Sequence, residues 1–158
     1  MLETEHDPIS GLRSDSEELA EIIMQMHRRF LPKLSEELSR GSVSFPQYFL
    51  LGYLENHQVM TMTAIAAEMG HTTAAASGLV DRLEKLGYVE RCHTVNDRRK
   101  VMVRNTPKGS GLVAQIRHGI VERIMTILRD QLTVEEGKNW LQIYRKIAAY
   151  CENSPKHD

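Results

Sequence analysis

Basic side chains gather in one segment of this sequence, and their chemistry suits a polyanion. The whole chain of 158 residues has a formal net charge of −1. Residues 91–108 nevertheless contain six Lys and Arg residues against one acidic residue, Asp97. The basic residues are Arg91, Arg98, Arg99, Lys100, Arg104 and Lys108. Because guanidinium and ammonium groups neutralise phosphates and release counterions, this segment is a candidate for contact with nucleic acid.

The motifs of common catalytic and metal sites are missing from the sequence. It has no Gly-rich phosphate loop, no GxSxG and no HExxH. Its histidines are not paired at one-turn spacing, whereas a zinc site needs three or four converging ligands. We therefore predict a protein that is not an enzyme and that has no metal site and no cofactor.

The N-terminus, the hydropathy and the cysteines indicate the cellular setting. The stretch MLETEHDPISG is acidic and polar, unlike a signal peptide. No run of about 18 apolar residues is present, so we expect no membrane span. Two cysteines, Cys92 and Cys151, do not make a disulfide framework. We expect a cytoplasmic protein without membrane contact.

Apolar residues at three- and four-residue spacing predict helices along most of the chain. Residues 1–13 are expected to form a loose tail. Ser14 or Asp15 can then start a long helix, which Pro32 should weaken and Gly41 ends. The other expected helices are 45–56, capped by Ser44; 62–69, capped by Thr61; 73–86, capped by Thr72 and ended by Gly87; one beginning at Thr106 and Pro107; and one begun by a capping box at Thr133–Glu136 and reaching Cys151. Residues 152–158 are expected to form a C-terminal tail.

Two short segments between these helices alternate like strands, at 88–93 and 100–105. They follow two helices joined by the tight turn 70–72, so the expected unit over about 44–106 is a winged helix-turn-helix. The predicted fold class is mainly α with a small β-hairpin wing, in a single domain over 14–151.

The second helix of the helix-turn-helix has a polar face of unusually small side chains. The candidate DNA-binding residues there are Thr72, Thr73, Ala74, Ser77, Gly78 and Arg82. A helix of this diameter fits the major groove, and its N-terminal N–H groups suit phosphate. Small side chains limit base reading to hydroxyl hydrogen bonds and thymine methyl contacts, so we predict that DNA shape and the wing contribute to recognition.

The loop VNDRRK (95–100) is expected at the tip of the wing. Arg98, Arg99 and Lys100 are long cations that can reach an adjacent narrow minor groove or neutralise phosphates. Asp97 cannot attract DNA by its charge, so we expect it to orient an Arg or to shape the turn.

Three stretches together resemble the MarR family of bacterial transcription regulators: LVDRLEKLGYVER (79–91), NDRRK (96–100) and TPKG (106–109). The resemblance of element order extends over about 15–150. It implies a homodimer in which the helices over about 14–40 and 106–151 intertwine and two winged helices straddle a pseudo-palindromic site on double-stranded DNA. Arg98 and Arg99 match the family's wing arginines, and Arg82 matches a basic position near the phosphate backbone.

The sequence departs from the family pattern at two positions. Gly78 stands where many members have a basic or larger polar residue, which puts direct base reading in doubt. Asn105 stands where the pattern has Leu before the Thr, and we expect this change to affect only packing.

The resemblance also suggests a repressor that a small aromatic or phenolic effector releases from a promoter. The candidate effector-binding residues are Met26, Phe30, Phe45, Tyr48, Phe49 and Met69. Methionine and aromatic residues at helical spacing also fit a hydrophobic core, and that alternative stays open.

Two other functions stay open at this point. Cys92 lies beside Arg91, whose charge could lower its pKa, so a redox-sensing regulator of the same fold is one alternative. A winged helix that binds a protein instead of DNA is the other, and the cationic wing argues against it.

Overall fold

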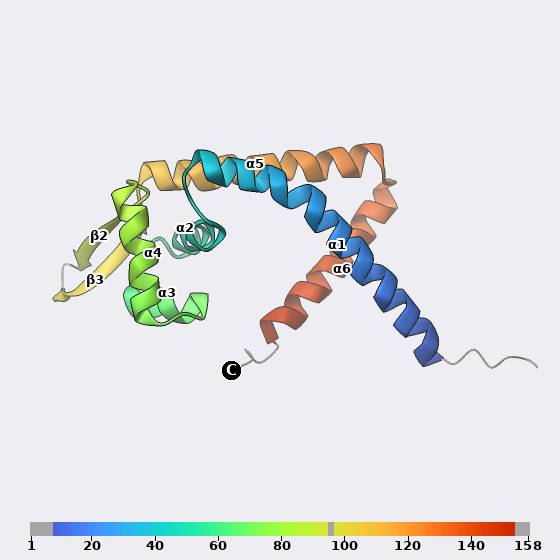
Figure 1. Ribbon diagram of the computed structural model, residues 1–158, viewed down its shortest axis with the longest axis horizontal. Helices are drawn as coiled ribbons and strands as arrows, with labels where there is room; N and C mark the ends of the chain where they lie inside the picture. The colour runs from blue at the N-terminus through green and yellow to red at the C-terminus, as the bar shows by residue number, and fades with distance from the viewer. Residues whose placement is uncertain (1–7, 95–96, 154–158) are drawn as a thin grey trace, which may run out of the picture. The chain divides into compact units, whose positions relative to one another are not determined.

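The computed structural model describes residues 8–94 and 97–153; the side chains of residues 8–10, 29–31, 33, 94 and 97–100 lie outside this description. The elements, labelled in Figure 1, follow in the order α1 (Pro8–Arg40), α2 (Phe45–His57), β1 (Met60–Thr61), α3 (Met62–Met69), α4 (Thr73–Lys85), β2 (Val89–Thr94), β3 (Asp97–Asn105), α5 (Pro107–Asp130) and α6 (Val134–Asn153). The predicted fold class, mainly α with a small β wing, is confirmed.

Local capping signals set the ends of the two helices of the helix-turn-helix. The Ala64 N–H donates to Thr61 Oγ1 (3.1 Å) at the start of α3. Gly70 ends α3 in a left-handed conformation, with φ 63°, which glycine adopts without strain. Thr72 then caps α4, where the Ala75 N–H donates to its Oγ1 (3.2 Å). The predicted helices 62–69 and 73–86 are thus confirmed to within a residue.

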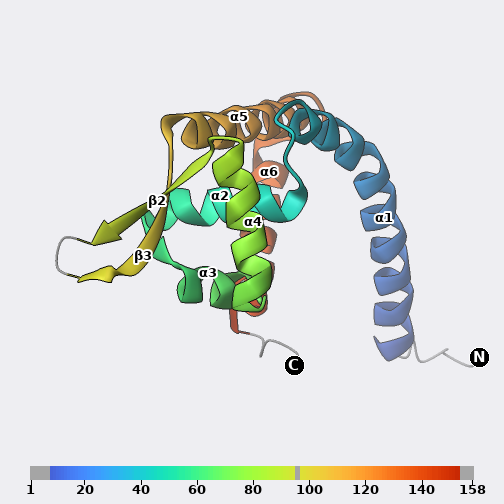
Figure 2. The same cartoon turned by 60° about the vertical axis from the view of Figure 1, so that its left-hand side comes forward.

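Three helices and the sheet share one hydrophobic core, and Figure 2 shows α2, α3 and α4 gathered beside the base of the hairpin. The largest fully buried side chains of this part are Leu50, Leu51, Leu54, Ile65, Val80, Leu83, Val89 and Val103. They come from α2, α3, α4, β2 and β3, so α4 and the wing are fixed to the same core.

The sheet has three strands in the order β1-β3-β2, all antiparallel. The sequence predicts only two of them. β1 was missed because a strand of two residues, in which Met60 pairs with Val103, has no periodicity to detect. β3 also starts at Asp97 rather than at Lys100, because Asp97 pairs with Thr94 beyond a shift of register after His93. The prediction that residues 97–99 lie in a loop is therefore wrong, while Val95 and Asn96 lie outside the described residues.

Tyr88 connects the end of α4 with the segments around it. Its hydroxyl donates to the Gly41 carbonyl (2.8 Å), just beyond the end of α1. Thr106 Oγ1 donates to the Gly87 carbonyl (2.7 Å), next to the first turn of α5. Gly109 packs so closely that a Cβ there would collide with the Tyr88 carbonyl oxygen. These contacts hold the base of the wing at a fixed place in the winged helix.

The helix α1 begins at Pro8, so the prediction of a loose tail is wrong for residues 8–13. Proline is well suited to the first turn of a helix, and this signal precedes the capping boxes at Ser14 and Asp15. The helix also continues through Pro32 to Arg40.

The chain forms two compact units, Met1–Val113 and Ala114–Asp158, with the boundary inside α5. The second unit contains the rest of α5 and the whole of α6. The predicted capping box begins α6: the Thr133 N–H donates to Glu136 Oε2 (2.8 Å) and the Glu136 N–H donates to Thr133 Oγ1 (3.3 Å). The single domain predicted over 14–151 stays a prediction.

Candidate nucleic-acid interface

The helix α4 has one buried face and one exposed face. Ala76, Val80 and Leu83 are fully buried at the spacing of one helix face. The opposite face leaves Thr73, Ala74, Gly78 and Arg82 exposed, and Ser77 half-buried beside them. The predicted outward residues therefore share one accessible surface, which also includes Thr72 at the N-cap.

Open space surrounds the centre of this surface. A Cβ added to Gly78 would meet nothing within 4 Å. The glycine is therefore not required by packing inside the chain. A flat stretch of Thr, Ala, Ser and Gly allows another molecule to approach the helix backbone closely.

An ion-pair cluster ties the C-terminal half of α4 to β2. Arg91 donates to Asp81 Oδ1 (2.6 Å) and to Glu84, which lie one turn apart on α4. Burial disfavours the charged guanidinium, but the two carboxylates outweigh this effect and raise the pKa of Arg91. The cluster neutralises carboxylates that would repel a phosphate backbone. It also fixes the first half of the wing against α4.

Two more basic residues of the cationic segment have partners within the chain. Arg104 on β3 donates to Glu90 Oε1 on β2 (2.6 Å), and this carboxylate raises the pKa of Arg104. Lys108 Nζ donates to the Leu86 carbonyl (2.6 Å) and lies 4.5 Å from the centroid of the Tyr88 ring. Counting charges along the sequence missed these pairings, because the partners lie up to 22 residues away.

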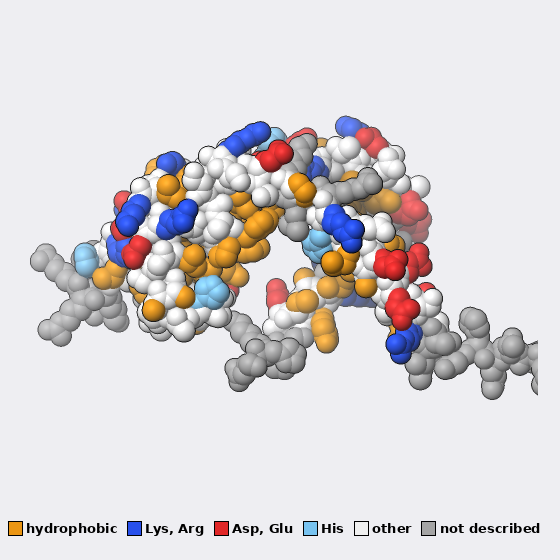
Figure 3. All heavy atoms as spheres, in the orientation of Figure 1, with side chains coloured by type: hydrophobic (Ala, Val, Ile, Leu, Met, Phe, Trp, Pro, Cys, Tyr) orange, Lys and Arg blue, Asp and Glu red, His pale blue; other side chains and the backbone are white. Residues whose placement is uncertain are grey.

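The remaining cations of the wing are Arg98, Arg99 and Lys100. Their backbone belongs to β3, and their side chains lie outside the described part of the structure, as does that of Asp97. Figure 3 shows described Lys and Arg side chains over the α4 and β2 side of the winged helix. Arg82 and Lys85 of α4 are both exposed. The DNA-contacting roles of the wing residues stay predictions.

Two of the six predicted effector-binding residues lie at one hollow, and the effector site as a whole stays a prediction. Phe49 and Met69 line a shallow hollow of about 200 Å³ between α2 and α3, together with Tyr53, Glu68 and His71. Phe45, Tyr48 and Met26 do not line this hollow, and the side chain of Phe30 lies outside the described residues. Sequence reasoning did not name Tyr53, Glu68 and His71, which supply the polar groups of this hollow.

The two cysteines are both free. Cys92 is half-buried on β2 opposite Met102, and Cys151 is exposed near the end of α6. In the described ranges, no three His, Cys, Asp or Glu residues gather as a metal site would require. No helix within the same ranges is both long and apolar enough to cross a membrane.

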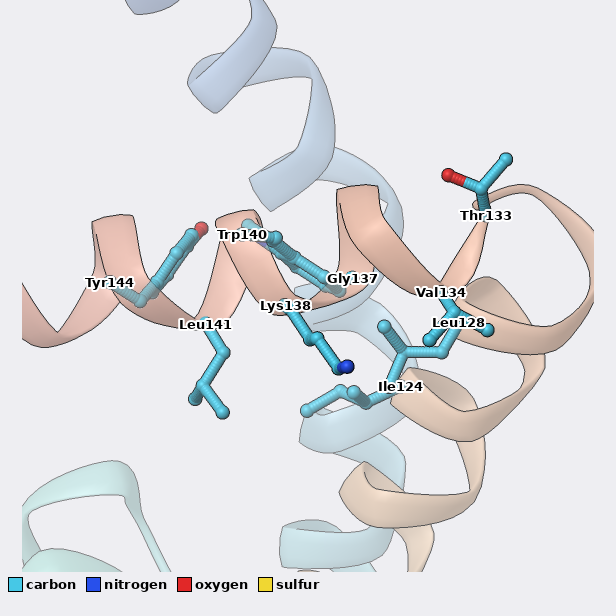
Figure 4. A pocket seen from close by; sticks show the side chains of 9 residues that line it. All are labelled: Ile124, Leu128, Thr133, Val134, Gly137, Lys138, Trp140, Leu141 and Tyr144. Atoms are coloured by element: carbon cyan, nitrogen blue, oxygen red, sulfur yellow. The ribbon is translucent and has the colours of Figure 1, made fainter.

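A larger apolar hollow lies in the second unit, between the end of α5 and α6 (Figure 4). Its volume is about 540 Å³. Ile124 and Leu128 face it from α5, and Trp140, Leu141 and Tyr144 face it from α6. Sequence reasoning identified these residues as apolar stripes but could not show that the two helices leave a space between them.

Comparison with known proteins agrees with this geometry. Residues 42–100 match the model of the MarR family. The uncharacterized HTH-type transcriptional regulator YfiV of Bacillus subtilis is 44% identical over 70 residues, a match that covers 44% of this chain and 44% of that protein. The matched region is therefore less than half of that relative.

Solved structures extend the likeness over most of the fold. The YusO protein from Bacillus subtilis has 26% sequence identity and a TM-score of 0.68, covering 92% of this chain and 98% of that one. S. aureus MepR in a complex with DNA has 23% identity and a TM-score of 0.71, covering 84% of this chain and 98% of that one. The helix-turn-helix, the three-stranded wing and these matches together show a winged helix of MarR type over residues 42–100, within a fold that resembles solved structures over most of the chain.

Proposed function

We propose that this chain is a homodimeric, sequence-specific DNA-binding transcription regulator. The observation that carries the proposal is the exposed face of α4, whose N-terminal half has only small side chains. It lies in the same unit as β3, which begins with an acidic residue and three basic ones. The proposal is supported by MepR, which is similar in fold and has been crystallised with DNA.

The dimensions of α4 suit the major groove. Its 13 residues make a rod of roughly 20 Å, and the groove of B-DNA is roughly 12 Å wide. In this pose Thr73 and Ser77 offer hydroxyls to base edges, and Ala74 offers a methyl group to thymine. Gly78 allows the backbone to approach the DNA. The resulting preference would rest on shape and thymine methyls more than on bidentate hydrogen bonds.

The wing would supply most of the electrostatic affinity. Arg91 and Arg104 are already paired with carboxylates, so they should release few counterions from DNA. Arg98, Arg99 and Lys100 would enter the adjacent minor groove or contact phosphates. The wing is expected to dominate the salt dependence of binding, although it forms a small part of the chain.

A second copy of the chain would cover the exposed apolar surface of the helices outside the winged helix. The helix α6 has no buried residue, and Leu141, Tyr144 and Ile147 are each more than half exposed. The hollow between α5 and α6 gives this pair of helices no filled core of its own. Large exposed apolar patches favour association, and a two-fold dimer would present two α4 helices to two half-sites.

Repression would follow from occupying a promoter, and an effector would release the dimer. The hollow beside Phe49 and Met69 is the candidate effector site, because His71 on its wall directly precedes the N-cap of α4. The Tyr53 hydroxyl and the His71 imidazole suit a small phenolic ligand. A ligand acts only if it binds the released state more tightly than the DNA-bound state.

Capture of genomic fragments tests the proposal. The full chain is incubated with sheared genomic DNA at two salt concentrations, and the retained fragments are sequenced. Arg99→Ala is the test variant. Arg104→Ala is the matched control, because it removes the same charge from the same strand at a residue already paired with Glu90.

The proposal predicts that wild type and Arg104→Ala enrich the same few imperfect palindromes, less strongly at higher salt, and that Arg99→Ala loses them. Failure of the folded wild-type chain to enrich any site at either salt would contradict it. In that case a protein partner for the winged helix would be the next candidate.

A further inference from the structure

Asn105 occupies a position that joins three elements. It is the last residue of β3 and pairs with Val89, the first residue of β2, so it marks the base of the wing. Its Nδ2 donates to the carbonyl of Leu51 in α2 (2.9 Å) and to Glu55 Oε2 (3.0 Å), one turn further along the same helix. Two donors of one amide group are thus directed at two acceptors of α2.

The same carboxylate extends the link to α5. Ser110 in the first turn of α5 donates its hydroxyl to Glu55 Oε2 (2.7 Å). Glu55 therefore accepts from β3 and from α5 at one oxygen atom. The hydrogen bonds from Ser110 and Asn105 lower the pKa of Glu55, so the carboxylate stays charged near neutral pH.

Stability alone does not account for an asparagine here. Its Oδ1 is buried and has no hydrogen-bond partner, which costs free energy that a leucine would not lose. This oxygen faces Gly109, where there is no room for a side chain. A leucine could fill the space between α2 and the sheet, but its apolar contacts have no preferred direction and would not fix the angle between the hairpin and α2. Asn105 keeps two directed hydrogen bonds although its own carbonyl oxygen is unsatisfied. This combination indicates that the side chain positions the hairpin relative to α2.

A small rotation at the base of the wing produces a large displacement at its far end. From Val89, which pairs with Asn105, to Thr94, which pairs with Asp97, is five steps of strand, or roughly 17 Å at about 3.3 Å per residue. A rotation of about 10° at the base would move this end of the hairpin by roughly 3 Å over that length. The minor groove of B-DNA is roughly 6 Å wide, so such a displacement is about half of its width and would misplace an arginine in it.

We propose that Asn105 is a positioning residue: with Glu55 and Ser110, its amide fixes the orientation of the β2–β3 hairpin relative to α2 and so determines where the wing meets DNA. The last clause rests on the proposed function. The first part concerns the protein without DNA and can be tested separately.

The first test measures hairpin orientation without DNA. Residual dipolar couplings of the β2 and β3 amides are fitted in the frame defined by α2, α3 and α4. Asn105→Leu is the test variant, because it keeps the branching and the number of side-chain heavy atoms while removing both donors and the unsatisfied carbonyl. Glu90→Gln is the matched control, since it breaks the pair with Arg104 inside the hairpin and leaves the link to α2 intact.

The proposal predicts that Asn105→Leu is folded, yet its hairpin is rotated or less ordered. Glu90→Gln should keep the wild-type couplings. If Asn105→Leu does not fold, Glu55→Ala, an exposed position on α2, should produce a smaller change of the same couplings. An unchanged orientation in the folded variants would overturn the proposal.

The second test uses a DNA fragment that wild type has enriched. Asn105→Leu should bind it at least about tenfold more weakly. The loss of hydroxyl-radical protection should be confined to the positions contacted by the wing. Equal affinity and an identical footprint, together with a rotated hairpin, would overturn the clause about DNA. Failure of the wild type itself to bind would refute the proposed function and leave the orientation measurement valid.

Discussion

Substitution of Gly78 should change stability and DNA affinity in opposite directions. Gly78 lies within α4, is exposed, and has open space where a side chain would begin. Glycine in a helix interior costs about 1 kcal/mol relative to alanine, because its backbone loses more conformational freedom on folding. Gly78→Ala should therefore raise the free energy of unfolding by about 0.5–1 kcal/mol, and the melting temperature by about 2–4 °C per kcal/mol.

The effect on DNA should grow with the size of the new side chain. Gly78→Leu places a branched side chain where the helix backbone is proposed to approach the major groove. Its affinity for an enriched site should fall at least about tenfold, which corresponds to 1.4 kcal/mol. Gly111 of α5 is also exposed and has open space around it, so Gly111→Ala and Gly111→Leu are the matched controls.

Urea unfolding gives the stabilities of these variants, and fluorescence anisotropy with labelled DNA gives the affinities. The Gly111 variants should change stability and leave DNA affinity as in wild type. The reasoning would be refuted if Gly78→Leu bound its site as tightly as wild type. A loss of stability in Gly78→Ala would refute the view that this glycine is free of packing constraints.

Three further predictions follow from contacts elsewhere in the chain. Tyr88→Phe removes the hydrogen bond to the Gly41 carbonyl and should lower the free energy of unfolding in urea by about 1 kcal/mol; an unchanged midpoint would contradict that value. Hydrogen bonds from Ser110 and Asn105 lower the pKa of Glu55. The stability that the charged carboxylate contributes is therefore present above pH 4.5, the ordinary pKa of Glu, and is lost as the pH falls through the lowered pKa. Glu55→Gln should flatten this acid limb of stability against pH, and an identical profile would show that the carboxylate contributes nothing. Ile147→Asp places a charge on the exposed apolar stripe of α6 and should convert a dimer to a monomer in size-exclusion chromatography with light scattering; a dimer of unchanged affinity would exclude this face.

Local signals in the sequence identify the elements that position the candidate interface. The caps Thr61 and Thr72, the stop at Gly87 and the capping box Thr133–Glu136 each act within a few residues, so they can be identified without the fold. The outward face of α4 follows from helical spacing alone. For these features the structure agrees with the sequence because each one is decided by its own neighbours in the chain.

The features that sequence analysis missed depend on residues far apart in the chain. The strand β1 exists because Met60 meets Val103 in β3. The pairing of Arg91 with Asp81 and Glu84 needs β2 to lie against α4, and it neutralises a cation that a count along the sequence treats as free. Asn105 was expected to affect packing alone, whereas it forms directed hydrogen bonds to a helix more than 50 residues earlier.

Methylation protection of an enriched DNA site would test the central claim most directly. Dimethyl sulfate modifies guanine N7, which lies in the major groove, so protection at N7 reports the position of α4. We predict that wild type protects two half-sites centred about 34–36 Å, one helical turn, apart, and that Gly78→Leu loses this protection while Gly111→Leu keeps it. Tight binding by wild type without protection at N7, or with a single protected site, would contradict a dimer that reads DNA through its α4 helices.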